Sequence, residues 1–271
     1  MENSRIAAQG LVLLGCGKMG SAMLEGWLAR GLPAASVWVR DPYPSEWLQA
    51  TGVQINTDLP ATPAIVLVAV KPQMMAEALP VLRNMGNSDT VFVSVAAGTP
   101  ISFFETTLGA QTPVVRAMPN TPAAISQGIT AIVANDYAGA RGLDEAESLL
   151  SAVGEVVRLS EEAQIDAVTG VSGSGPAYVF HMIETLADAG VAEGLPADMA
   201  MQLARATVAG AGALAMAADE DPTQLRINVT SPNGTTQAAL EVLMDEQDGM
   251  PALMRRAVAA AAARSRELAR G

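Results

Sequence analysis

Cysteine and histidine are nearly absent from this chain of 271 residues, which has one of each, Cys16 and His181. A single cysteine excludes an internal disulfide, and the two residues offer too few ligands for a structural zinc site. His181 falls in the middle of an expected helix, where we expect a core or surface role. We therefore expect no metal centre and no histidine-based active site.

Basic and aromatic residues are also scarce. The chain has 16 Lys and Arg against 28 Asp and Glu, a net charge of −12, and no run rich in Lys or Arg. It lacks the positive surface with which proteins bind nucleic acid or an anionic membrane, so we expect neither partner. Because aromatic residues make up only 4% and hydrophobic residues 50%, the core must be built from Ala, Val, Leu, Ile and Met.

No apolar run is suited to crossing a membrane. The longest, Met199–Ala218, is interrupted by Arg205 and consists mostly of small residues. The segment Met1–Ala8 carries charge and lacks the apolar stretch of a signal peptide. We therefore expect a cytoplasmic protein.

The first part of the chain alternates short β-branched runs with helical segments, a pattern typical of a doubly wound α/β sheet. The expected strands are Leu11–Leu14, Val37–Val39, Ile65–Val70, Val91–Val95, Val114–Ala117 and Ile129–Val133. The expected helices are Lys18–Arg30, Pro72–Met85, Ile101–Leu108 and Arg141–Ser151. Several strands are apolar throughout, as strands covered on both faces are. The sequence therefore predicts a Rossmann-like, dinucleotide-binding parallel sheet as the first domain, residues 1–160.

No convincing strand follows after about Glu161. The expected helices are Ser174–Gly190, Pro196–Ala218, Thr235–Asp245 and Pro251–Arg270, separated by turns rich in Gly, Pro and Asn. The stretch Ala200–Ala217 is apolar almost all round, and a helix of this kind is buried on every side. A second domain of residues 161–271 has little room to bury it alone. We therefore expect an all-helical domain that forms a homodimer.

The segment Gly15-Cys16-Gly17-Lys18-Met19-Gly20 follows the first expected strand and opens a helix. In this strand–turn–helix setting the Gly-x-Gly-x-x-Gly spacing indicates a dinucleotide site. The first glycine permits a tight turn, the second lets the backbone approach a pyrophosphate, and the third allows close helix packing. The helix start adds N–H groups that favour an anion. A glycine turn without a ligand is the alternative.

The end of the second strand usually discriminates between NADP and NAD. An arginine there accommodates the 2′-phosphate, whereas an acid accepts a hydrogen bond from the ribose hydroxyl. Here Arg40 comes first and Asp41 second, so we expect NADPH, with NADH as the alternative. The other interpretations are a solvated charge for Arg40 and a turn-forming role for Asp41 before Pro42. We also expect Lys71, at the end of the strand Ile65–Val70, to contact the cofactor or the active site rather than water alone.

A second polar turn, Ser231-Pro232-Asn233-Gly234-Thr235-Thr236, runs into an amphipathic helix. The N–H groups of Gly234, Thr235 and Thr236, joined by hydroxyls, would form an anion site without a cation, which suits a carboxylate. An ordinary Ser/Thr cap is the alternative, but one hydroxyl is enough for a cap.

Together these segments resemble pyrroline-5-carboxylate reductase over essentially the whole chain. The motifs that carry the resemblance are the glycine turn, Ala69–Pro72, Val93–Gly98, Ala117–Pro122, Ser172–Tyr178 and, most specifically, the turn Ser231–Thr236. The resemblance implies a dinucleotide domain followed by a helical dimerisation domain, dimers that assemble into larger rings, and NADPH as the cofactor. It implies hydride transfer from the nicotinamide to the C=N carbon of the cyclic imino acid 1-pyrroline-5-carboxylate, which gives proline.

The resemblance also assigns site residues. Ser231, Thr235 and Thr236, with Gly234 of the same turn, are expected to hold the substrate carboxylate, and Thr236 is the best candidate for a hydrogen bond near the imine nitrogen. Glu162 is expected beside the substrate pocket and Asn228 beside the nicotinamide. The residues expected to line the rest of the dinucleotide are Asn56, Ala69, Val70, Lys71, Pro72, Ala96 and Ala97.

Two positions depart from the family pattern. Lys18 stands where the family often has Asn, and Asn233 replaces a usual Gly. Because Asn tolerates left-handed backbone angles, the second turn can survive its substitution. Lys18 is expected either to strengthen phosphate binding or to project into solvent.

Three other functions share features with this chain. A β-hydroxyacid dehydrogenase has a similar two-domain plan but needs a lysine in its second domain, and no lysine follows Lys71. A reductase of another cyclic imine and a dinucleotide-sensing scaffold without catalysis stay open. The absence of an evident general acid agrees with imine reduction, because a protonated iminium is already electrophilic.

Overall fold

The computed structural model describes residues 5–269, so the ends of the expected domains and the last residue of the expected helix Pro251–Arg270 lie outside the described residues. The chain divides into two compact units. The first combines the described parts of Met1–Gly173 and Ala261–Gly271, and the second is Ser174–Ala260.

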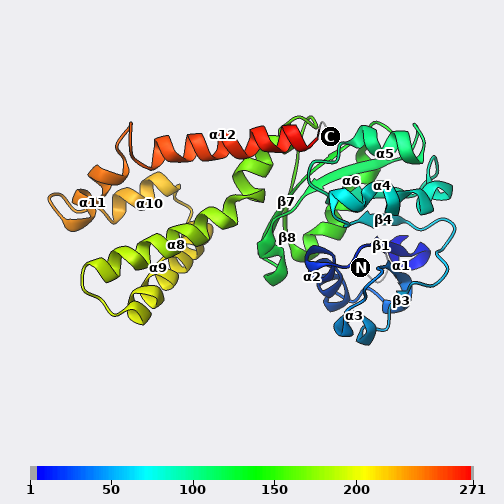
Figure 1. Cartoon of the computed structure of the whole chain (residues 1–271), viewed down its shortest axis with the longest axis horizontal. Coiled ribbons are helices and arrows are strands. Elements are labelled where there is room, and N and C mark those ends of the chain that lie inside the picture. The colour runs from blue at the N-terminus through cyan, green and yellow to red at the C-terminus, as the bar shows by residue number, and fades with distance from the viewer. Residues whose placement is uncertain (1–4, 270–271) are drawn as a thin grey trace. The chain divides into compact units, whose positions relative to one another are not determined.

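The first unit is built on an eight-stranded sheet with the strand order β3-β2-β1-β4-β5-β6-β7-β8 (Figure 1). The strands are β1 Leu11–Leu14, β2 Val37–Arg40, β3 Gln54–Ile55, β4 Ile65–Val68, β5 Val91–Ser94, β6 Val114–Met118, β7 Gly128–Ala134 and β8 Gly154–Arg158. Every pair is parallel except β6 with β7. The predicted Rossmann-like doubly wound sheet is confirmed.

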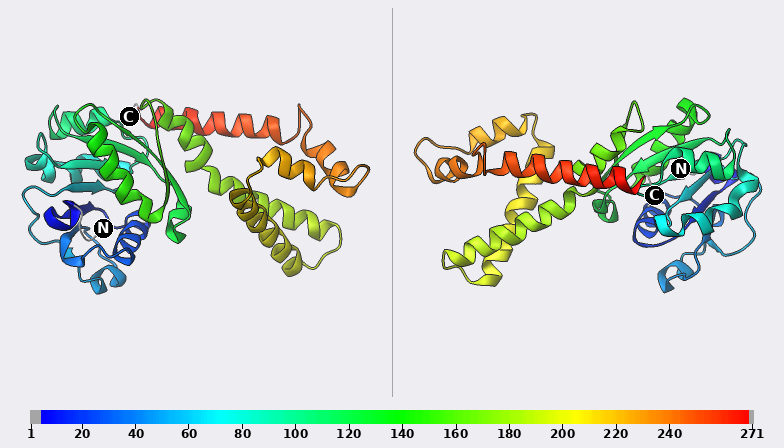
Figure 2. Two further views of the ribbon diagram at one scale, coloured as in Figure 1. Left: turned by 180° about the vertical axis from the view of Figure 1, so that it is seen from behind. Right: turned by 45° about the horizontal axis from the view of Figure 1, so that its top comes forward.

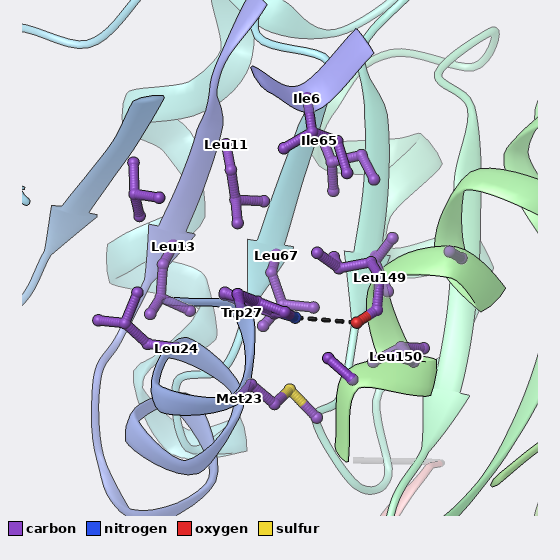
Figure 3. Close-up of a cluster of buried hydrophobic side chains, with 14 of the residues drawn as sticks. Ile6, Leu11, Leu13, Met23, Leu24, Trp27, Ile65, Leu67, Leu149 and Leu150 are labelled. Atoms are coloured by element: carbon purple, nitrogen blue, oxygen red, sulfur yellow. Dashed lines mark hydrogen bonds between the residues drawn. The ribbon is translucent and has the colours of Figure 1, made fainter. Parts of the chain in front are cut away.

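The central strands are buried on both faces because successive side chains point to opposite sides of a sheet. In β1, Leu11 and Leu13 enter one hydrophobic cluster, whereas Val12 and Leu14 enter the other. Figure 3 shows the first cluster, to which Trp27 belongs. The indole Nε1 of Trp27 donates to the backbone oxygen of Leu149 at 2.9 Å. This bond satisfies the one polar atom that the buried indole carries.

The α-helices of the first unit that precede its second segment lie before, between and after the strands. They are α1 Arg5–Gln9, α2 Lys18–Ala29, α3 Glu46–Ala50, α4 Met75–Ala78, α5 Ile101–Leu108, α6 Gly139–Leu150 and α7 Gln164–Val168. The prediction of one helix over Pro72–Met85 was wrong, because α4 lies between the 3₁₀ segments Pro72–Met74 and Leu79–Met85. Pro80 sits in the first turn of the second of these, where a ring without an N–H cannot continue an α-helix.

Two strands and one strand direction differ from the expectation. β3 has only Gln54 and Ile55, and the edge strand β8 combines two valines with the charged residues Glu155 and Arg158, so neither carries a strong hydrophobic signal. β7 runs antiparallel to β6. The connection between them holds only the 3₁₀ turn Thr121–Ile125, which is too short for the crossover that a parallel pair requires.

The second unit is helical throughout its described residues, as predicted. Its helices are α8 Gly175–Ala192, α9 Ala197–Ala217, α10 Pro222–Asn228, α11 Thr235–Leu243 and the first part of α12 Met250–Leu268. The sequence analysis missed α10, although Asp221 caps it by accepting from the Gln224 N–H at 3.0 Å. α8 and α9 run side by side (Figure 2), and their buried contact consists of Ala187, Ala200 and Ala204.

The units divide the chain at Gly173, later than the expected boundary after residue 160. The segment between these positions packs into the first unit because Ile165 of α7 is fully buried in its second cluster. The hydroxyl of Ser265, near the end of α12, donates to the carboxylate of Asp166 at 2.6 Å. Among the described residues, no helix has the length and apolar character needed to span a membrane.

Candidate functional site

The three glycines of the predicted turn differ in the space that an added side chain would have. Gly15 has φ +88°, and a Cβ added to it would lie 2.8 Å from Val70 Cγ1. A Cβ on Gly20 would lie 2.5 Å from the backbone oxygen of Gly15, so only glycine lets α2 approach the turn. A Cβ on Gly17 would meet nothing within 4 Å. That open space is where a bound group can approach the backbone, as the glycine pattern predicts.

The turn lies where the strand order of the sheet reverses. β1 has β2 on one side and β4 on the other, and the strand ends are held in register by bonds from Gly15 N–H to Arg40 O and from Ala69 N–H to Leu14 O, both 2.8 Å. In open α/β sheets, ligands bind outside the carboxyl ends of the strands at such a switch point. The structure brings together at this edge the glycine turn and the predicted residues Arg40, Asn56, Ala69, Val70, Lys71, Pro72, Ala96 and Ala97.

The start of α2 is open to an anion. Gly17 is its N-cap, and no side chain caps the first-turn N–H groups. Lys18 is exposed at the first helical position and Met19 is half-buried behind it. Cys16 is half-buried, and this burial, with a smaller effect from the carboxylate of Asp41, raises the pKa of its thiol to about 11. The thiol is therefore neutral at physiological pH and is no nucleophile.

The end of β2 carries the cation Arg40, and the next residue, Asp41, has a carboxylate that is already hydrogen-bonded. Arg40 Nη1 donates to the backbone oxygen of Asn56 at 3.3 Å, and its Nε is buried without a partner among the residues described. Asp41 accepts from the Cys16 N–H at 2.7 Å and from the Tyr43 N–H at 2.8 Å. An open glycine turn, an uncapped helix start and an arginine at the second strand end fit NADP.

Glu162 is held by a partner that the sequence analysis missed. Arg116, buried in β6, donates from Nη1 to Glu162 Oε1 at 2.7 Å, and the same oxygen accepts the Ile101 N–H at the start of α5 at 2.9 Å. A guanidinium in an otherwise apolar strand was the available signal, because a buried charge needs a counter-ion. Within residues 5–269 the Nε and Nη2 of Arg116 have no partner. Glu162 is thus fixed in place and two donors remain beside it.

The second polar turn belongs to the other unit. Asn233 has φ +58°, as its tolerance of left-handed angles predicted, and its N–H donates to Gln237 Oε1 at 2.7 Å. Gly234 is the N-cap of α11, which no side chain caps. One expectation was wrong: the Gly234 N–H does not point outward but donates to Ser231 O at 3.0 Å and closes the turn. The N–H groups of the first turn of α11 are left to bind an anion.

The hydroxyls of this turn are free to bind a ligand as far as the described residues are concerned. Ser231 and Thr235 are exposed and Thr236 is half-buried, and in the part of the chain that the structure describes their hydroxyls make no hydrogen bond. Asn228, at the end of α10, is exposed and accepts from Gln224 Nε2 at 2.7 Å. These residues belong to the second unit, whereas the dinucleotide edge and Glu162 belong to the first.

The single histidine lies on a helix of the second unit. His181 is exposed on α8, with its Nδ1 3.2 Å from Glu184 Oε2. Over the described range, no three His, Cys, Asp or Glu side chains are grouped so that they could hold a metal ion.

A doubly wound sheet with a glycine turn at its switch point is typical of dinucleotide-dependent oxidoreductases. The comparisons agree: residues 10–98 match a family described as NADP oxidoreductase, coenzyme F420-dependent, and residues 162–268 match pyrroline-5-carboxylate reductase dimerisation. A pyrroline-5-carboxylate reductase from Pseudomonas aeruginosa is 40% identical, over 99% of this chain and 98% of that protein.

Solved structures agree with these relatives. A pyrroline-5-carboxylate reductase from Coxiella burnetii has 32% identity and a TM-score of 0.89, covering 96% of this chain and 98% of that one. The Plasmodium falciparum pyrroline carboxylate reductase, solved with NADP bound, has 28% identity and a TM-score of 0.81, covering 99% of each chain. This chain belongs to the pyrroline-5-carboxylate reductase family and is an NAD(P)H-dependent oxidoreductase. The predicted family, fold and cofactor class are confirmed.

Proposed function

We propose that this chain reduces the C=N bond of 1-pyrroline-5-carboxylate with a hydride from NADPH and gives L-proline, the last step of proline biosynthesis. The observation that carries the proposal is the match to pyrroline-5-carboxylate reductase over 99% of the chain, which includes both the glycine turn and the second polar turn.

The substrate carboxylate is held by the turn Ser231–Thr236. Three hydroxyls without a partner and the uncapped start of α11 offer more donors than a helix cap needs. The dinucleotide phosphates already have the helix start at Gly17, so the second anion site is free for the substrate. The helix N-terminus and the hydroxyls together bind a carboxylate without a cation.

The protein's task in this reaction is to bind, orient and exclude water. NADPH, when bound, supplies the hydride, and the protonated imine is electrophilic enough to accept it without a strong general acid. Thr236 hydrogen-bonds near the imine nitrogen. The resemblance to the family implies a place beside the substrate for Glu162, which Arg116 and the Ile101 N–H fix in place. We expect its charge to favour the protonated imine.

The dinucleotide lies along the carboxyl edge of the sheet. The glycine turn would bind its pyrophosphate and Arg40 its 2′-phosphate, and Asn228 would contact the nicotinamide. The remaining contacts are Cys16, Lys18, Met19, Asn56, Ala69, Val70, Lys71, Pro72, Ala96 and Ala97. The open space at Gly17 and the unpartnered Nε of Arg40 support this placement.

The assembly is a homodimer formed by the helical domain, residues 161–271, with a ring of dimers as the larger form. The match of residues 162–268 to the dimerisation family supports both the dimer and this functional boundary. We further propose that the enzyme works in the cytoplasm, and cell fractionation tests this.

The direct test is a spectrophotometric assay of NADPH and NADH oxidation with five-membered and six-membered cyclic imino acids. We expect the highest kcat/KM with NADPH and 1-pyrroline-5-carboxylate. A preference for the six-membered ring would assign the chain to another cyclic imine. No turnover with any imine, in a protein that binds NADPH, would favour the sensing scaffold.

A further inference from the structure

Asp41 occupies the position at which an acid in a dinucleotide-binding sheet ordinarily accepts from the ribose hydroxyl of NAD. In this chain its carboxylate is already engaged. Oδ2 accepts the Cys16 N–H at 2.7 Å and Oδ1 accepts the Tyr43 N–H at 2.8 Å. Cys16 is the second residue of the glycine turn, so the carboxylate joins the end of β2 to the phosphate-binding turn after β1.

Asn56 holds the backbone of the same residue. Its side-chain oxygen accepts the Asp41 N–H at 3.1 Å, and its side-chain nitrogen donates to the Asp41 carbonyl at 2.8 Å. Asn56 reaches this position with φ +54°, an angle that Asn tolerates better than most residues. Main chain and side chain of Asp41 are therefore both fixed, and the carboxylate is directed toward the turn.

We propose that Asp41 is a positioning residue that fixes the glycine turn for either dinucleotide, and that it does not accept from the ribose hydroxyl. Cofactor choice then rests on Arg40, whose Nε has no partner within the described chain. The two N–H donors also direct partial positive charge at the Asp41 carboxylate, which lessens its repulsion of a 2′-phosphate near Arg40. Adjacent residues thus have separable tasks: Arg40 selects the cofactor and Asp41 shapes the turn.

This inference rests on the dinucleotide site of the proposed function and not on its imine substrate, so binding measured without substrate separates the two. Calorimetric titration of the full chain gives Kd for NADPH and for NADH. We expect Asp41→Ala to raise both Kd values by about the same factor, roughly tenfold or more, because a charge-assisted bond to the turn is lost. Asp41→Asn, whose Oδ1 can still accept the Cys16 N–H, should recover most of the affinity.

Arg40→Ala is the matched comparison, expected to weaken NADPH and leave NADH nearly unchanged. Asn56→Gly suits the positive φ and keeps the backbone of residue 56 at the cofactor edge, but it removes both side-chain bonds to Asp41, so it should reproduce the Asp41→Ala result. The variant that combines Asp41→Ala with Asn56→Gly should bind the cofactor no more weakly than Asp41→Ala alone. Both substitutions release the same hydrogen-bonded group, so their effects should not add.

A readout without cofactor completes the test. Amide exchange at Cys16 in the free protein should be slow in the wild type and faster in Asp41→Ala and in Asn56→Gly, at unchanged melting temperature of the core. Selective loss of NADH affinity in Asp41→Ala would mean that Asp41 holds the ribose, and the inference would be wrong. Unchanged Kd values with unchanged Cys16 exchange would also overturn it. If Asp41→Ala does not fold, Asn56→Gly and Asp41→Asn decide by the same criteria.

Discussion

A single hydroxyl can carry much of the substrate affinity at a site that has no cation. Thr236 is half-buried in the first turn of α11, and its hydroxyl has no partner in the part of the chain described. We predict that Thr236→Val lowers kcat/KM for the imino acid by roughly one to two decades, since a hydrogen bond to a charged group contributes about 1.5–3 kcal/mol. Steady-state kinetics measures this.

Cofactor binding separates the substrate role of Thr236 from a general defect. NADPH titration of Thr236→Val should give a nearly unchanged Kd. Thr106→Val is the control, because the Thr106 hydroxyl is exposed and already donates to Ser102 O within α5. Loss of NADPH affinity with an intact KM for the imine would place the turn at the dinucleotide instead.

Cys16 gives a prediction for alkaline pH. Its pKa is raised from the ordinary 9.0 to about 11, mainly by burial and further by Asp41. Below pH 9 the thiol is protonated in both states and its contribution to stability is complete. Between about pH 9 and 11 the unfolded thiol loses its proton while the folded one keeps it, so stability falls as pH rises.

The difference in melting temperature between wild type and Cys16→Ala isolates this effect, because other groups titrate equally in both proteins. Above pH 9 we expect the melting temperature of the wild type to fall relative to that of Cys16→Ala. Below pH 9 the difference should be constant. Alkylation of the folded wild type at pH 8 should also be slow, since the thiolate is the reactive form. Fast alkylation at that pH would contradict the raised pKa.

At the scale of elements, two glycines of the turn between β1 and α2 have different roles. Gly17 leaves room for a ligand, and Gly20 allows close packing. A Cβ at Gly17 enters open space, whereas a Cβ at Gly20 would collide with the backbone oxygen of Gly15. We predict that Gly17→Ala keeps the melting temperature of the free protein but raises the Kd for NADPH. Gly20→Ala should raise that Kd and also destabilise the fold by about 1–3 kcal/mol, as overpacking does.

Thermal melting without cofactor and titration with NADPH measure the two effects on the same samples. The pair serves as its own control, because both variants add one methyl group to the same turn. An equal loss of stability in both variants would mean that the space at Gly17 is not reserved for a ligand.

How far the elements could be predicted depends on the strength of their hydrophobic pattern. The run Leu11–Leu14 is apolar throughout and bounded by glycine, so its strand was predicted at its observed limits. The edge strand Gly154–Arg158 mixes charges with valines and was missed. The segment Pro72–Met85 has helical composition, but Pro80 breaks its hydrogen-bond pattern, which composition alone does not reveal.

The candidate site was predictable in part for a similar reason. Glycine spacing and an excess of hydroxyls are local features, so Gly15–Gly20 and Ser231–Thr236 could be found in the sequence. The bond from the Cys16 N–H to the Asp41 carboxylate joins residues 25 positions apart, and the pair of Arg116 with Glu162 joins residues 46 apart. Such partners depend on which strands become neighbours, and strand order is a property of the whole sheet.

At the scale of the molecule, the two units differ in how they bury apolar residues. The sheet of the first unit fills two clusters of large side chains, whereas the buried cluster of the second consists of Ala187, Ala200 and Ala204. Its larger residues stay exposed: on α9, Met199 is 48%, Leu203 51% and Leu214 55% exposed. With 3.6 residues per turn, spacings of four and eleven residues place these three on one face of the helix. An apolar face of this kind is typical of a permanent interface.

We predict that Leu214→Asp, made in the full chain, yields a smaller species than the wild type in sedimentation velocity at micromolar concentration. The charge would have to be buried without a partner in the dimer, whereas in the single chain it faces water, so folding is spared and association is lost. Val81→Asp is the control, since Val81 is 60% exposed on the first unit and should leave the assembly unchanged. A wild type that sediments as a monomer, or a Leu214→Asp protein that sediments like the wild type, would remove this face from the dimer interface.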